Sequence, residues 1–110
     1  MDVCQDGDLK GHLIVWDAYE AANQQFIVSQ TGDETTIKSR KSNKFLTVAA
    51  NSTQNGVPIL EEPLEGLAGE RFRLQETSPG SKEYIIFTFC GKALDCCEEG
   101  KKNGTRIIQW

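Results

Sequence analysis

The fold is decided by the stretch Lys44-Phe45-Leu46-Thr47-Val48, which is followed after a short loop by Asn55-Gly56-Val57-Pro58-Ile59-Leu60. Each part contains a short apolar or β-branched run, and Asn55 and Gly56 stand at the turn before the second run. Runs of this length, bounded by turn residues, are typical of β-strands rather than helices. The stretch therefore predicts two short strands joined by a turn.

This pattern occurs three times along the chain. The strand Leu46-Thr47-Val48 has counterparts at Met1-Asp2-Val3, 45 residues earlier, and at Leu94-Asp95-Cys96, 48 residues later. The second strand has counterparts at 11–16 and 103–110. Self-similarity in a fixed order at this spacing indicates a repeat architecture.

Two further kinds of strand complete the pattern. Residues 23–28 match residues 69–74 at an offset of 46. Residues 35–40 alternate between polar and apolar side chains, and residues 83–89 are rich in aromatic and β-branched side chains. Both of these last two runs precede a turn and the strand that begins each hairpin. We therefore expect four kinds of short strand in the same order in each repeat.

Helix-like composition is confined to residues 17–22 and 64–70. These windows are too short for independent helices, so we expect single helical turns within loops. The chain is then all-β, with ten strands arranged as three, four and three. A length of 110 residues suits one domain, which spans 1–110. Its repeats cover about residues 1–30, 31–77 and 78–110.

Composition and charge exclude several classes of function. The chain is 38% hydrophobic and 25% charged, as is usual for globular proteins, and carries a net charge of -4. Because its Lys and Arg residues are interspersed with Asp and Glu, we expect neither nucleic acid nor membrane as a partner. The sequence has no apolar run long enough to span a bilayer and does not begin like a signal peptide. We expect a cytoplasmic protein, or a secreted one if the N-terminus is a truncation.

The cysteines and the histidine do not predict a metal site or a catalytic centre. Cys96 and Cys97 are adjacent, which suits neither a disulfide framework nor zinc-ligand spacing with Cys4, Cys90 and the single His12. We expect free thiols, no metal and no cofactor. His12 has no recognisable nucleophile setting beside it, and no glycine-rich phosphate loop is present. The sequence therefore predicts a protein that is not an enzyme.

In their order and spacing, the repeats resemble the ricin-type (ricin B-like) β-trefoil lectin domain. Residues 36–74 look like one full repeat, and residues 91–110 look like most of another. Gln24-Gln25-Phe26 is similar to the Q-x-W signature of that family, with Phe in place of Trp. The resemblance implies a β-trefoil that binds carbohydrate, with galactose-type glycans or glycoproteins as partners.

The resemblance also implies the site residues. A sugar offers adjacent hydroxyls to a carboxylate or amide and an apolar face to an aromatic ring. In that family, each sugar site consists of an Asp from the second strand of a repeat, an aromatic residue near the end of the third strand, and an Asn just before Q-x-W. The first repeat supplies Asp2, Trp16, Asn23 and Gln24, and the third supplies Asp95 and Trp110. The middle repeat has Thr47, Glu61 or Glu62, and Gly69 at these positions, so we expect no working site there.

These residues also have interpretations that involve no ligand. Trp16 can be a core residue, Asp2 and Asn23 can close turns, and Gln24 can be structural. The alternative function is a non-catalytic protein-interaction module of β-trefoil fold, an inhibitor or adaptor without a working sugar site. Its candidate surface is the acidic loop 61–69, which contains two leucines.

The resemblance also implies an open barrel, because the family has twelve strands and this sequence predicts ten. The two that lack a counterpart are the first strand of the first repeat and the last strand of the third, which are neighbours in the family's barrel. Unpaired strand edges invite pairing with another chain. We expect a homodimer or a swapped assembly, or else a partner segment that completes the barrel.

Overall fold

The chain folds into the three, four and three strands that the sequence predicts. The computed structural model describes residues 1–19, 21–100 and 102–110. The first repeat contributes β1 (Asp2–Val3), β2 (Leu13–Ile14) and β3 (Phe26–Thr31). The second contributes β4 (Glu34–Ser39), β5 (Phe45–Val48), β6 (Ile59–Glu62) and β7 (Phe72–Glu76). The third contributes β8 (Tyr84–Thr88), β9 (Leu94–Cys96) and β10 (Ile107–Gln109).

Four single-turn 3-10 helices lie within the described part of the chain. They are η1 (Ala22–Gln24), η2 (Ala49–Asn51), η3 (Ala68–Glu70) and η4 (Cys97–Glu99). The helical turn predicted at 64–70 occurs at the end of that window, as η3, whereas η1 overlaps the predicted window 17–22 only at Ala22, and residue 20 of that window lies outside the described residues. The strands predicted to begin at residues 23 and 69 begin at Phe26 and Phe72 instead, because the preceding residues form η1 and η3.

Three short antiparallel hairpins give the fold its repeat. They are β1–β2, β5–β6 and β9–β10. In each, the second strand follows a turn whose glycine has a positive φ, at Gly11 (83°), Gly56 (84°) and Gly104 (90°). This backbone conformation strains any residue with a Cβ, which explains why glycine stands at the same place in every repeat.

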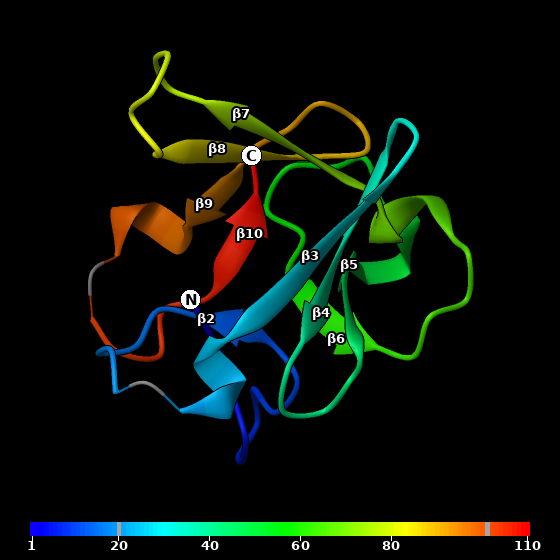
Figure 1. The fold of residues 1–110 in the computed structure, drawn as a ribbon. Helices are drawn as coiled ribbons and strands as arrows, with labels where there is room; N and C mark the ends of the chain where they lie inside the picture. The colour runs from blue at the N-terminus through cyan, green and yellow to red at the C-terminus, as the bar shows by residue number, and fades with distance from the viewer. Residues whose placement is uncertain (20, 101) are drawn as a thin grey trace.

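Two longer hairpins connect successive repeats. β3 pairs with β4 over six residue pairs, and β7 pairs with β8 over five. A bridge between Thr35 and Phe72 joins β4 to β7, so the four strands form one strip in the order β3, β4, β7, β8. Figure 1 shows the two hairpins as separate arms, in cyan and in yellow. These strands and the three short hairpins correspond to the barrel and the cap of a β-trefoil.

A single core holds the three repeats together. Its buried members come from every repeat: Val3, Leu13, Ile37, Leu46, Val48, Ile59, Phe72 and Ile107. Phe26, Leu74 and Ile86 pack against this cluster from the two long hairpins. Burial of this apolar surface drives folding, and it fixes the strand ends from which the site residues project.

Candidate functional site

The first repeat brings its four predicted site residues to one place. Asp2 lies on β1 opposite Ile14 of β2 and is only 3% exposed. Its Oδ1 accepts a hydrogen bond from Asn23 Nδ2 at 3.0 Å, and its Oδ2 accepts one from Gln24 Nε2 at 2.9 Å. A buried carboxylate requires such partners, because burial of an unpaired charge is costly. η1 places both amides against β1, so residues 21 and 22 positions apart form one constellation.

Gln24 serves mainly to hold the others in place. Its Nε2 also donates to the Asp17 carbonyl oxygen at 2.8 Å, and its Oε1 accepts from the Tyr19 backbone N–H at 2.9 Å. With the bond to Asp2, both amide hydrogens and the carbonyl oxygen have protein partners. Gln24 therefore orients Asp2 and ties the 17–19 loop to η1. Gln24 thus has a structural role, which is one of the two roles that the sequence left open for it.

Asp2, Asn23 and two aromatic residues line an open hollow of about 180 Å³. The aromatics are Trp16, which is 47% exposed, and Tyr19, which is also exposed. An indole that is half in solvent is not part of the core, so Trp16 is free to contact a ligand. The hollow thus combines a hydrogen-bonded carboxylate, an amide and exposed rings.

Tyr19 belongs to this site although the sequence did not single it out. Its hydroxyl lies 3.0 Å from Asn23 Oδ1 and 2.9 Å from Asn23 Nδ2. Nδ2 already donates to Asp2 and, at 3.2 Å, to the Val3 carbonyl oxygen. Its two hydrogens are therefore used, and the Tyr19 hydroxyl donates to Oδ1. The only sequence signal for this contact was an aromatic residue three positions after Trp16.

The third repeat holds half of the same constellation. Asp95 and Trp110 are both exposed and line a hollow of about 500 Å³ together with Arg106. Trp110 packs close to Gly56 of the second repeat, where an added Cβ would meet its ring at 3.9 Å. Its backbone is fixed by two hydrogen bonds with Ala93, at 2.9 and 3.0 Å. Within the described residues, no amide side chain stands beside Asp95 as Asn23 stands beside Asp2.

The middle repeat fills the equivalent space with its own chain. Asn51 Oδ1 accepts the Gly69 backbone N–H at 2.8 Å. A Cβ added at Gly69 would lie 2.8 Å from that oxygen and 3.0 Å from Thr47 Oγ1. Thr47 is buried, and Glu62 stands where the other repeats have tryptophan. This packing leaves no room beside Thr47 for the amide that the first repeat uses.

The remaining reactive groups of the described ranges are the cysteines, His12 and the acidic residues outside the hollow. The four cysteines are free. Among the described residues, no three His, Cys, Asp or Glu side chains form a cluster that could hold a metal ion. Burial, and secondly the charge of Arg106, lower the pKa of His12 below its usual 6.5, so this side chain is neutral at physiological pH. No helix in the described ranges is long and apolar enough to cross a membrane.

The fold of this chain matches known proteins. A solved structure of a designed 3-fold symmetric protein, ThreeFoil, superposes with a TM-score of 0.88 at 27% identity, over 99% of this chain and 79% of that one. An exo-β-1,3-galactanase from Clostridium thermocellum superposes with a TM-score of 0.80 at 24% identity, over 86% of this chain but only 21% of the galactanase. No curated protein matches this chain. A family model described as a ricin-type beta-trefoil lectin domain-like fold matches residues 10–110. The chain therefore belongs to the ricin-type β-trefoil lectin-like family, a fold of carbohydrate-binding modules.

Proposed function

We propose that this protein is a non-catalytic lectin that binds a galactose-type glycan in the hollow of its first repeat. The observation that carries the proposal is the paired carboxylate Asp2 beside the exposed ring of Trp16. A carboxylate has about four lone-pair sites, of which the two amides use two. In the proposal, the other two accept hydrogen bonds from adjacent sugar hydroxyls.

The exposed ring of Trp16 supplies the apolar part of recognition. A pyranose presents C–H groups on one face, and an exposed indole can cover that face. Trp16 has this role in the proposal, while Tyr19 fixes the amide of Asn23 through its hydroxyl. The hollow of about 180 Å³ is smaller than the roughly 300–1,000 Å³ of drug-sized pockets, so we propose that it holds a single sugar ring.

Galactose-type sugars are the ligands that the family resemblance implies, and they are the first to test. We propose Asp95 and Trp110 as a second, weaker site, because they repeat the carboxylate and the ring without the amide. Because no amide lies beside Asp95, this second site offers a sugar fewer hydrogen-bonding groups than the first-repeat site does. The first repeat is therefore expected to dominate binding.

Glycan-array screening tests this proposal. The wild type is compared with Asp2→Ala and Trp16→Ala, with Trp110→Ala as the matched control in the third repeat. We expect the wild type to retain galactose-terminated glycans, Trp16→Ala to lose them, and Trp110→Ala to keep most of the signal. Trp16→Ala must remain folded by circular dichroism, which its exposure predicts. If the wild type binds no glycan, the lectin proposal is wrong.

A further inference from the structure

A turn of the third repeat holds the segment that carries Trp16. The turn consists of Asn103, Gly104 and Thr105, just before β10. The Gly104 N–H donates to the Val15 carbonyl oxygen at 2.8 Å, and the Val15 N–H donates to the Thr105 carbonyl oxygen at 2.8 Å. These two hydrogen bonds fix the backbone immediately before the indole.

Asn103 extends this contact to the residue after the indole. Its Oδ1 accepts the Asp17 backbone N–H at 2.9 Å, and its Nδ2 donates to Asp17 Oδ2 at 3.0 Å, across a sequence separation of 86. One amide thus bonds both the backbone and the carboxylate of a single residue, and the second bond is charge-assisted. We call the four hydrogen bonds from residues 103–105 to Val15 and Asp17 the clamp.

The indole needs such support because the rest of the molecule covers only part of it. Trp16 is 47% exposed, so core packing does not set its position as it does for a buried ring. The residue after it is also tied inward, since Gln24 Nε2 donates to the Asp17 carbonyl oxygen at 2.8 Å. Asp17 is therefore held from two sides, by Gln24 of its own repeat and by Asn103 of the third.

The partners of this contact are different where the turn of the first repeat meets the second repeat. Lys10 precedes the turn glycine there, as Asn103 does in the third repeat. Pro63 follows the position of the missing tryptophan, as Asp17 follows Trp16. Proline has no backbone N–H to donate, and a lysine side chain cannot accept a hydrogen bond. The repeat that is expected to have no sugar site therefore lacks both groups that form the Asn103 part of the clamp.

We infer that Asn103 is a positioning residue of the first-repeat site, which acts through Asp17 to hold Trp16 beside the hollow. A ring that is already ordered loses less conformational freedom when a ligand binds, so the clamp raises affinity. The sugar site of the first repeat then depends on a side chain of the third. The inference rests on the proposed function for its ligand, but the ordering of Trp16 is measurable without one.

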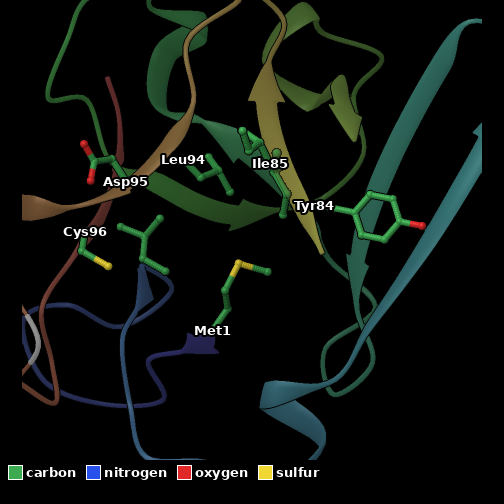
Figure 2. Close-up of a pocket in the computed structure, with 8 residues that line it drawn as sticks. Met1, Tyr84, Ile85, Leu94, Asp95 and Cys96 are labelled. Atoms are coloured by element: carbon green, nitrogen blue, oxygen red, sulfur yellow. The ribbon is translucent and has the colours of Figure 1, made fainter. Parts of the chain in front are cut away.

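Trp110 provides a reference within the same molecule. The residue before it exchanges backbone hydrogen bonds with Gly56 and Val57, at 2.9 and 3.0 Å, so a turn of the second repeat helps to anchor it. In Figure 2, the Asp95 carboxylate points away from the neighbouring Leu94 side chain. Asp95 and Trp110 line a hollow of their own. A change at residue 103 should therefore leave the order of the Trp110 ring unchanged.

Two variants break the clamp and then restore it. Asn103→Asp keeps a turn-forming residue and an oxygen for the Asp17 N–H, but it sets one carboxylate against another. Asp17→Asn combined with Asn103→Asp returns one amide and one carboxylate with their places exchanged, so both bonds can form again. The matched control, Asn55→Asp, makes the same change at the equivalent turn position of the second repeat.

Relaxation of the ¹⁵N-labelled free protein measures the ordering. We expect the backbone order parameters of Trp16 and Asp17 to fall in Asn103→Asp from about 0.85 toward about 0.6, and to recover in the double variant. Trp110 should keep its order in both, and Trp16 should keep its order in Asn55→Asp. An Asn103→Asp variant in which Trp16 stays as ordered as in the wild type would overturn the inference.

Titration of the same samples with lactose measures the effect on binding. Asn103→Asp is expected to raise the dissociation constant by about three- to tenfold, whereas the double variant and Asn55→Asp should bind as the wild type does. A double variant that binds as weakly as Asn103→Asp would also contradict the inference. If the wild type binds no lactose, the proposed galactose specificity fails, and the order of Trp16 alone then decides whether Asn103 positions it.

Discussion

Removal of the Asp2 carboxylate by Asp2→Ala should destabilise the fold even without any sugar present. The carboxylate accepts two charge-assisted hydrogen bonds, at 3.0 and 2.9 Å, in a place where it is 3% exposed. Hydrogen bonds to charged groups contribute about 1.5–3 kcal/mol each. Asn23 retains the Val3 carbonyl oxygen as an acceptor and Gln24 retains that of Asp17, so part of each amide stays satisfied. We therefore expect a total loss of about 2–3 kcal/mol.

Urea unfolding followed by circular dichroism measures this loss. With a slope of about 1–3 kcal/mol per molar urea, the midpoint should fall by about 1 M. The matched control is Asp95→Ala, which removes the equivalent carboxylate of the third repeat, where it is exposed. That variant should stay within about 0.5 kcal/mol of the wild type. Both variants are compared at one protein concentration. Equal midpoints for the two variants would refute the assigned role of Asp2.

Three further outcomes follow from the structure. Leu46→Ala, at a fully buried core position, should cost about 2–5 kcal/mol in urea unfolding, whereas Leu64→Ala, at a side chain that is 54% exposed, should cost under about 0.5. The folded-state pKa of His12 is lowered below 6.5, so His12 takes up a proton at a higher pH in the unfolded chain than in the folded one. Thermal stability should therefore drop as the pH falls below about 6.5, and it should drop less in His12→Gln. Gly69→Ala should lower the urea midpoint, because its Cβ would lie 2.9 Å from the Val48 carbonyl oxygen, and an unchanged midpoint would contradict this packing.

The repeat order was predictable from the sequence because each strand carries its own local signal. Ile107–Gln109 and Leu94–Cys96 are flanked by turn residues, and their counterparts recur at near-constant spacing. The strand starts were less predictable. Residues such as Asn23 and Gly69 look like parts of the following strands, but they lie in 3-10 turns that are fixed by contacts with β1 and η2. Those contacts come from residues far away in the sequence.

The candidate site was predictable only in part. Asp2, Trp16, Asn23 and Gln24 could be chosen because a family pattern places them in order. Tyr19 could not be, because its role depends on how the loop after β2 folds back against η1. The orienting role of Gln24 was not predictable either, because only the folded structure shows that all of its side-chain hydrogen-bonding atoms have protein partners.

The gap in the barrel was anticipated, but the sequence did not say which strand edges flank it. That followed from the strip order, which places β3 and β8 at its two ends. The exposure of Val28 and Tyr84 then located the apolar surface between those edges.

The central claim is that a galactose-type sugar stacks on Trp16 above Asp2. It is tested most directly by titration of lactose into the ¹⁵N-labelled protein while the indole N–H signals of Trp16 and Trp110 are followed by NMR. The proposal predicts that the Trp16 signal shifts in a saturable manner, at lower lactose concentrations than any shift of Trp110, and that Asp2→Ala abolishes the shift. A Trp16 signal that stays in place throughout the titration would contradict it.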